Sequence, residues 1–446
     1  MEKKMARRMS RRTAMVLPLG LLSGCSIFGS EEKPPVPGIK IPVIGAHQVL
    51  SPSHNAPPVS LPSPDKSADW PQSGRNSAHV AGNAVLPSRF GSSWSTSIGA
   101  GSTYRQYLNA KPIVVGGRVF AMDAAGHVDA LSLSDGHRLW RKSMRPRHDN
   151  SYAIGGGLAF ANGILYVATG FSELRALDPA SGATRWRKSL GQPARSAPTI
   201  GGGLIMLVLL DNTLIAREQK SGAFAWRFPA AESANSVLGA GAPAYQDGIV
   251  VAGFGSGQLA GINAMTGSAL WEQSLAAGYG ISNPLNISSI VADPVISGEL
   301  VIATALSNST AAFDMRSGRV IWSLDAGGSF TPAVAGEWLF LLTESQRLAA
   351  IHTRDGAVAW VTQLPQYRNE KKQSGPISWC GPLLADSRLF VAGNNKRLLT
   401  VDARNGSLLE DPESALVLTG PAQQAPITAA GELLVLTSHA VLTAYR

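Results

Sequence analysis

Cysteine is nearly absent from this 446-residue chain, which contains only Cys25 and Cys380. Two cysteines cannot build a disulfide framework, and metal ligation by spaced cysteine pairs is excluded. Charged residues are also scarce, at 15%, whereas 44% of the residues are hydrophobic. Such a composition excludes a chain that is disordered throughout.

The signatures of common active sites are missing as well. The sequence contains no Gly-x-Gly-x-x-Gly, Walker, His-Glu-x-x-His or Gly-x-Ser-x-Gly motif. The eight histidines are scattered singly, and we expect His127, His137 and His352 to be exposed polar side chains. From the residues alone we therefore expect no catalytic residues, no metal site and no cofactor.

Most of the positive charge lies at one end of the chain. The net charge is +9, and the first 24 residues hold six Lys and Arg against one Glu, which leaves +4 for the remainder. Nucleic-acid binding requires a clustered basic face. The composition shows none, so we do not expect a nucleic-acid partner.

The N-terminal sequence is typical of a targeting segment. Basic residues up to Arg12 precede the apolar stretch 13–22, which is shorter than the roughly 20 residues of a membrane span. The following Leu-Ser-Gly-Cys, residues 22–25, resembles the bacterial lipobox. The resemblance implies a lipoprotein signal peptide over residues 1–24 and an acylated Cys25 at the mature N-terminus. Ser26 in place of Asp then implies the periplasmic face of the outer membrane.

Proline marks the next segment. Nine prolines fall between Glu31 and Trp70, and proline fixes φ and lacks a donor N–H. We expect residues 25–69 to be a semi-extended tether that ends where a folded domain, residues 70–446, begins.

One motif then recurs along the chain. An apolar strand leads into a turn that ends in glycine, and a tryptophan follows four residues later. The glycines lie 46, 40, 45, 51, 38 and 50 residues apart, and the seventh copy has Glu410 in place of tryptophan. A side chain at one fixed offset points the same way in every copy, so we expect the tryptophans to dock neighbouring units: Trp140, Trp186, Trp226, Trp271, Trp322 and Trp360.

A second repeat precedes each hairpin, a small residue and proline before an apolar strand, as in Lys111-Pro112 and Ala197-Pro198. Together the two repeats define eight units, the last of which stops before its hairpin. We therefore predict an all-β fold, an eight-bladed β-propeller of four-stranded antiparallel blades. We expect the N-terminal strand 92–98, around Trp94, to join the last blade and close the ring.

Two insertions depart from the repeat, residues 278–292 and residues 365–375, the latter carrying Arg368, Lys371 and Lys372. Long loops on a rigid scaffold often bind partners. A solvated loop is the alternative for both.

The repeat resembles the PQQ-type propeller repeat shared by quinoprotein alcohol dehydrogenases and the BamB family of outer-membrane β-barrel assembly lipoproteins. A lipobox followed by one propeller favours the BamB family, as do residues 69–74 (Asp-Trp-Pro-Gln-Ser-Gly). The resemblance implies a non-enzymatic scaffold that binds the periplasmic domains of BamA and other subunits of the assembly machinery. It also implies a role in the assembly and insertion of outer-membrane proteins.

Three residues correspond to the docking regions of that family. The stretch 190–198 carries Leu190 and Arg195 ahead of a Ser-Ala-Pro strand start, and we expect the Arg195 side chain to be free to reach a partner. The family's Asp-x-Asp is replaced by Ser-Ile-Val at 289–291, with Asp293 displaced by two positions.

Two other functions remain open. One is a PQQ-dependent quinoprotein dehydrogenase, although those enzymes characteristically have adjacent cysteines, which this chain lacks. The other is a lipid-anchored propeller that binds a different envelope partner, because a fold alone does not fix a function.

Overall fold

A computed structural model of the chain describes residues 50–66, 68–89, 91–149, 151–152, 155–232, 239–276, 288–412 and 415–446. The chain divides into two compact units, Met1–Gly45 and Ala46–Arg446, and all the described residues belong to the second. The predicted signal peptide and Cys25 lie outside the described residues.

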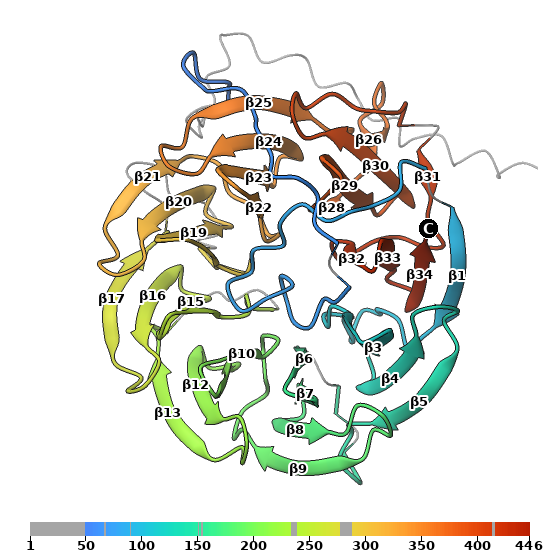
Figure 1. Ribbon diagram of the computed structural model, residues 1–446, viewed down its shortest axis with the longest axis vertical. Coiled ribbons are helices and arrows are strands. Elements are labelled where there is room, and N and C mark those ends of the chain that lie inside the picture. The colour runs from blue at the N-terminus through green and yellow to red at the C-terminus, as the bar shows by residue number, and fades with distance from the viewer. Residues whose placement is uncertain are drawn as a thin grey trace, which may run out of the picture. The chain divides into compact units, whose positions relative to one another are not determined.

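The second unit is an all-β propeller of eight four-stranded antiparallel blades, as the repeats predicted (Figure 1). In each blade the strands follow one another from the centre of the ring to its rim. No helix occurs among the described residues, so none there is long and apolar enough to cross a bilayer.

The blades are numbered in chain order by their strands. Blade 1 consists of β2 (Ile113–Val115), β3 (Arg118–Met122), β4 (His127–Ser132) and β5 (Arg138–Ser143). Blade 2 consists of β6 (Gly156–Ala161), β7 (Ile164–Thr169), β8 (Glu173–Leu177) and β9 (Thr184–Ser189). Blade 3 consists of β10 (Thr199–Gly201), β11 (Leu204–Val208), β12 (Thr213–Glu218) and β13 (Phe224–Pro229). Blade 4 consists of β14 (Ala244–Gln246), β15 (Ile249–Gly253), β16 (Gln258–Asn263) and β17 (Ala269–Ser274). Blade 5 consists of β18 (Val295–Ser297), β19 (Leu300–Ala305), β20 (Ser309–Asp314) and β21 (Val320–Leu324). Blade 6 consists of β22 (Ala333–Ala335), β23 (Trp338–Leu342), β24 (Arg347–His352) and β25 (Val358–Gln363).

The last two blades depart from this regular order. Blade 7 is β28 (Trp379–Ala385), β29 (Arg388–Gly393), β30 (Arg397–Asp402) and a two-residue outer strand, β31 (Leu416–Val417). Blade 8 has β32 (Ile427–Ala429), β33 (Glu432–Leu436) and β34 (Val441–Tyr445), and β1 (Ser92–Ser97) pairs antiparallel with β34 as its outer strand. The predicted insertion 365–375 contains a small hairpin of β26 (Tyr367–Asn369) and β27 (Ser374–Pro376), whereas most of 278–292 is outside the described residues.

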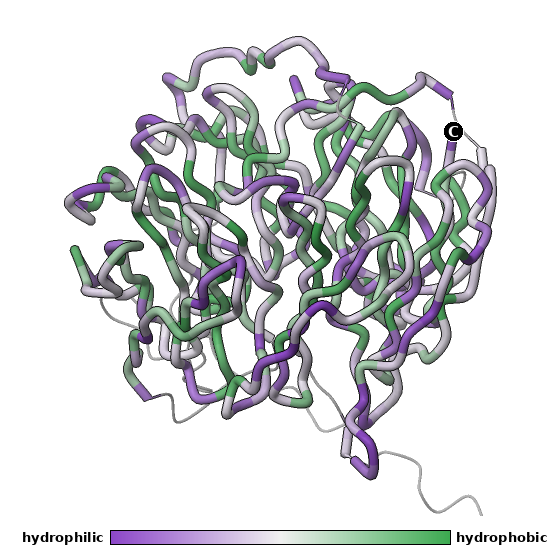
Figure 2. The backbone as a smooth tube through the Cα atoms, turned by 60° about the horizontal axis from the view of Figure 1, so that its bottom comes forward, coloured by the Kyte–Doolittle hydropathy of each residue, from purple (hydrophilic) through white to green (hydrophobic). Residues whose placement is uncertain are grey.

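The core lies between the blades. Buried Leu, Ile, Val, Ala and Phe side chains of adjacent sheets form clusters, and in Figure 2 the apolar stretches follow the strands while hydrophilic stretches gather at connections. The two middle strands of each blade are buried over most of their length because both faces of the sheet are covered. This explains why they read as nearly continuous apolar runs.

Each predicted docking tryptophan lies on the outer strand of its blade, against the glycine turn of the next. A Cβ on Gly182 would come within 2.9 Å of the Trp140 ring, and one on Gly267 within 2.7 Å of Trp226. The indole Nε1 of Trp140 donates to the carbonyl of Pro179 at 3.0 Å. Glycine is required at the turn for its positive φ and for this close approach of the ring.

The segment ahead of β1 forms an inner belt, residues 70–86, that runs around the centre of the ring (Figure 1). Its backbone or side chains pair with the innermost strand of seven blades in succession. The pairs are Trp70 with Val114, Pro71 with Phe160, Gln72 with Ile200, Ser77 with Tyr245, Ala78 with Ile296, Gly82 with Val334, and Ala84 with Ala385.

The predicted boundary between tether and domain lies too late in the chain. Within residues 50–69, Ser53 N–H donates to the carbonyl of Val358 at 2.8 Å, and Val59 and Leu61 pack against the core between blades 6 and 7. Proline-rich composition prevents this segment from forming regular strands, but single backbone groups still pair with blade edges. The described part of the predicted tether therefore belongs to the propeller.

Candidate functional site at the centre of the ring

A cavity of 270 Å³ lies at the centre of the ring. It is lined by the segments that immediately precede the innermost strands of six blades, and by Ser73 of the inner belt. The repeat places these segments at one end of the central channel because each blade starts its first strand there. Its polar lining includes Lys111, Arg195 and Asp293, together with Asn109 and Gln424.

Asp293 makes polar contacts with three groups at this cavity. Its side chain is buried and accepts hydrogen bonds from Ser73 Oγ at 2.6 Å and from the Ala242 N–H at 2.7 Å. The Lys111 ammonium lies 3.0 Å from Asp293 Oδ2. Burial opposes ionisation of Asp293, but Lys111 and these hydrogen bonds outweigh it and hold the pKa of Asp293 well below its usual range.

His79 of the inner belt is buried nearby. Its Nδ1 lies 2.7 Å from the carbonyl oxygen of Pro294, which only accepts, so this nitrogen carries the proton. Its buried Nε2 has no partner among the described groups. Burial lowers the pKa of His79, and the imidazole is therefore neutral, so Lys111 is the cation that balances Asp293.

Arg195 lines the same cavity, but its side chain is not free, contrary to the sequence-based expectation. Only 5% of Arg195 is exposed. Its Nε donates to the carbonyl of Gly239 at 2.7 Å and its Nη1 to Asn212 Oδ1 at 3.1 Å. The loop position predicted exposure, but the guanidinium lies between blade 3 and the connection to blade 4, where it bridges polar groups.

Leu190 lies apart from the other two predicted docking residues. It is buried beside a 390 Å³ groove between the outer parts of blades 2 and 3, which Phe224 and Arg227 also line. The structure therefore brings Arg195 and Asp293 together at the central cavity and leaves Leu190 at a different opening.

Sequence analysis missed one aromatic residue at the cavity and a second one close to it in the chain. Tyr107 lines it and is 43% exposed, and Tyr104, three residues earlier in the β1–β2 connection, is fully exposed. Arg105, between them, lies 6.0 Å from the ring of Tyr152. Two tyrosines in one short connection outside the repeat were the available signal, because exposed aromatic side chains are typical of binding surfaces.

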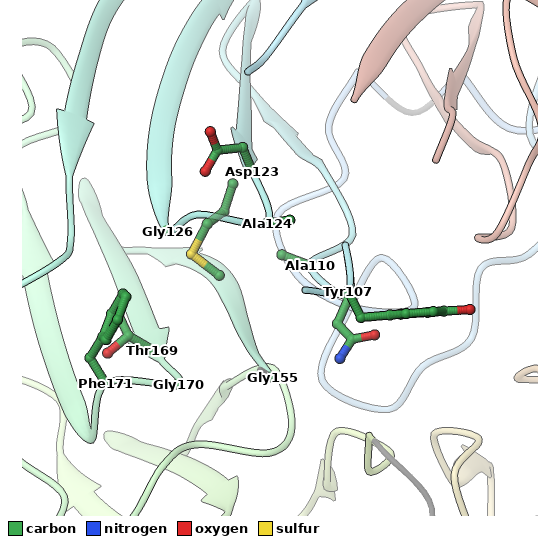
Figure 3. Close-up of a pocket in the computed structure, with 11 residues that line it drawn as sticks. Tyr107, Ala110, Asp123, Ala124, Gly126, Gly155, Thr169, Gly170 and Phe171 are labelled. Atoms are coloured by element: carbon green, nitrogen blue, oxygen red, sulfur yellow. The ribbon is translucent and has the colours of Figure 1, made fainter. Parts of the chain in front are cut away.

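A second, much smaller pocket adjoins the first. It has a volume of only 10 Å³, close to that of a single water, and shares Tyr107 and Asn109 with the central cavity. Figure 3 shows the Tyr107 ring directed away from Asp123 and Phe171, which lie on the far side of this pocket. The pocket is too small for a ligand of its own.

The remaining candidate groups are structural. Cys380 is buried, and burial raises the pKa of its thiol to about 12, so the thiol is inert at neutral pH. His127 contacts Asp123 at 3.0 Å, and His352 contacts Asp355 at 2.8 Å. Within the part of the chain that the structure describes, no three His, Cys, Asp or Glu side chains gather as metal ligands.

Comparisons with known proteins agree with this architecture. The family model described as outer membrane protein assembly factor BamB matches residues 124–362. The outer membrane protein assembly factor BamB of Yersinia pestis is 23% identical over 381 residues, covering 84% of this chain and 86% of that protein.

Two solved structures share the fold. The BamB of Moraxella catarrhalis superimposes with a TM-score of 0.68 at 17% identity, over 80% of this chain and 100% of that one. The quinohemoprotein alcohol dehydrogenase of Comamonas testosteroni has a TM-score of 0.64 at 14% identity, over 85% of this chain and 81% of that one. Because the family model spans more than half of the sequence, the chain belongs to the family of the outer membrane protein assembly factor BamB.

Proposed function

We propose that this protein is a non-enzymatic assembly factor for outer-membrane proteins that docks on the periplasmic domains of BamA through the mouth of the central cavity. The observation that carries the proposal is that Tyr107 lines the same cavity as the charged pair Lys111 and Asp293. The fully exposed Tyr104 lies three residues before Tyr107 in the same connection. Exposed aromatics around desolvated charges are typical of binding hot spots.

The chemistry of the mouth favours a polypeptide partner. Tyrosine offers a large contact area and a hydroxyl group at a low cost in conformational entropy. Lys111 is only partly buried, so its ammonium can also meet a carboxylate from outside, whereas Asp293 beneath it is almost inaccessible. Arg195 supports this wall by bridging Asn212 and Gly239, and acts on docking through the shape of the cavity.

Lipid anchoring at Cys25 is part of the proposal and rests on the lipobox resemblance. Replacing Cys25 with alanine is expected to release the protein from the membrane fraction or to leave its signal peptide unprocessed. Intact-mass measurement of the mature protein tests the acylation directly. An unmodified N-terminus at another residue contradicts it.

We also infer that the pairing of β1 with β34 closes the ring. The support is that Trp94 of β1 repeats the contact of the other tryptophans. Its Nε1 donates to the carbonyl of Leu133 at 2.7 Å, and its ring lies against Gly136 of blade 1. Removing β1 is therefore expected to expose the edge of β34 and to destabilise the entire unit.

Site-specific photocrosslinking in cell envelopes tests the docking. A crosslinker placed at Tyr104 is expected to capture BamA. The control is Met265, an equally exposed residue at the rim of blade 4. Failure to capture BamA at 104, or equal capture at both positions, contradicts docking at the cavity mouth.

The dehydrogenase alternative makes a separate prediction. The similarity to quinohemoprotein dehydrogenases concerns the fold alone, and the two cysteines of this chain lie 355 positions apart. Calorimetric titration with PQQ and calcium is expected to show no binding. Micromolar affinity, together with dye-linked alcohol oxidation, would favour the dehydrogenase.

A further inference from the structure

The position directly after each docking tryptophan differs between blades 1 to 3 and blades 4 to 6. In blades 1, 2 and 3 it holds Arg141, Arg187 and Arg227. In blades 4, 5 and 6 the same position holds Glu272, Ser323 and Val361. Because the repeat fixes the direction of this side chain, the three arginines lie along one arc of the rim, on β5, β9 and β13 (Figure 1).

The net charge also differs between blades 1 to 3 and the rest of the chain after them. Residues 118–227 contain fourteen Lys and Arg against eight Asp and Glu, a net charge of +6. Residues 228–446 contain twelve against seventeen, a net charge of −5. Bases that lie 40 to 46 residues apart in the sequence occupy equivalent positions on successive blades, so their grouping does not show in a count along the chain.

Several bases of this arc pair with carboxylates. Arg141 lies 2.9 Å from Asp123 and 3.4 Å from Asp129, and Arg185 lies 3.0 Å from Asp178. These bases balance acidic side chains of their own blades and add little free charge to the rim.

Three other bases have no such partner. Arg187, Lys188 and Arg227 are exposed and make no ion pair with any residue that the structure describes. The aliphatic stem of Lys188 lies against Gly222 of the next blade, while the residue as a whole is exposed. The arc therefore carries three cations that are free for an external anion.

Apolar side chains are interleaved with these cations. Leu139, next to the arc on β5, and Phe224 on β13 are both exposed. The guanidinium of Arg217 lies 6.0 Å from the Phe224 ring. Cations alternating with exposed apolar groups are typical of segments that rest on a membrane interface, where phosphates meet the cations and apolar groups enter the headgroup layer.

We propose that the basic arc, Arg187, Lys188 and Arg227 with Leu139 and Phe224 beside them, rests on an anionic phospholipid surface. The rim of the ring is convex, so it suits a flat and deformable surface better than it suits a folded partner of fixed shape. The unpaired cations are long flexible side chains, which match mobile headgroups. This inference is independent of docking at the central cavity and of the lipid at Cys25.

Vesicle co-sedimentation of residues 26–446, which contain all the described residues and no lipid, tests the proposal. Binding is expected to vesicles of phosphatidylethanolamine with phosphatidylglycerol, and not to vesicles of phosphatidylcholine. Each cation near an anionic surface strengthens binding roughly fivefold. Reversing all three with R187E, K188E and R227E is therefore expected to lower the partition coefficient by at least about a hundredfold.

A matched control changes the same total charge elsewhere. Arg316 and Arg319 of blade 5 and Lys372 of the inserted hairpin are exposed bases outside the arc, and R316E, R319E and K372E together alter the net charge equally. This control variant is expected to keep most of the vesicle binding. The circular dichroism spectra of the control variant and of the arc variant should both match that of the parent protein. Equal losses in both variants, or no preference for anionic vesicles, overturn the proposal. Charge-dependent capture of an acidic protein by the arc, without vesicle binding, overturns it in favour of a protein partner.

Discussion

Trp140 on the outer strand of blade 1 covers Gly182 in the hairpin turn of blade 2, with its indole nitrogen 3.0 Å from the Pro179 carbonyl. Two features require glycine at position 182: the positive φ of 69°, and the close approach of the Trp140 ring, which leaves no room for a Cβ. We expect Gly182→Ala to lower the free energy of unfolding by about 2–4 kcal/mol, because it combines left-handed strain with a clash against the ring. Chemical denaturation measures the change.

The turn glycine Gly163 of the same blade separates the two contributions. Its φ is 72°, but a Cβ there would meet nothing within 4 Å. Gly163→Ala should therefore show only the strain of about 1–2 kcal/mol. Equal losses in both variants would mean that the tryptophan contact contributes nothing.

Trp186 is the exception among the docking tryptophans. The carbonyl that would accept its hydrogen bond by analogy with the other blades is that of Gln219, and Tyr166 Oη already donates to it at 3.2 Å. The buried Nε1 of Trp186 has no partner among the described groups. We expect Trp186→Phe to cost about 1 kcal/mol less than Trp140→Phe, because only the second change removes a hydrogen bond. Equal costs in denaturant titrations would refute this assignment.

The buried His79 gives the fold a defined acid sensitivity. Burial lowers its pKa below 6.5 in the folded state, so below that pH only the unfolded chain takes up the proton. Stability is therefore complete above about pH 6.5 and falls as the pH drops, by up to about 1.4 kcal/mol per pH unit from this residue.

His79→Asn keeps a donor near the Pro294 carbonyl, tolerates the positive φ of 63° and does not titrate. The loss of stability between about pH 7 and pH 5.5 should be smaller in this variant by roughly 1 kcal/mol. Asp293 stays ionised between pH 7 and pH 5.5, because its pKa is held well below its usual range, so its own titration does not contribute to the difference. The exposed His54→Asn is the control, and an unchanged pH profile in His79→Asn would contradict the assignment.

Cys380 offers a direct probe of the folded state. In residues 26–446 it is the only thiol, and its pKa of about 12 and its burial protect it from thiol reagents. Labelling is expected only after unfolding in denaturant. Rapid labelling of the native protein would show that blade 7 opens.

The blades could be predicted from the sequence because each signal is local. The turn glycine, the tryptophan and the proline ahead of the first strand all fall within one repeat. The eighth unit stops before its hairpin, which indicated that the outer strand of blade 8 comes from another part of the chain. The inner belt could not be predicted in this way. Its contacts, such as Trp70 with Val114, are made largely by backbone groups, which leave no periodic pattern of side chains.

The sequence predicted some residues of the candidate site and missed others. Arg195 and Asp293 were identified by resemblance, and the structure places both at one cavity. Their burial depends on groups far away in the sequence, such as Lys111 for Asp293 and Gly239 for Arg195, and no local pattern reports these partners. Tyr107 at the cavity and Tyr104 close to it in the chain lie outside the repeat, so the periodic pattern did not single them out.

The burial of Arg195 also changes how docking must be tested. Arg195→Glu would place a carboxylate against the carbonyl of Gly239, and a loss of binding would then reflect a damaged fold. Exposed residues at the mouth avoid this ambiguity.

Titration of residues 26–446 against the purified periplasmic domains of BamA tests the central claim most directly. We expect saturable binding that Tyr104→Ala with Tyr107→Ala weakens by about 2 kcal/mol or more, roughly thirtyfold, while Met265→Ala leaves it unchanged. Absence of binding by the parent protein, or an unchanged affinity in the tyrosine variant, would contradict docking through the mouth of the central cavity.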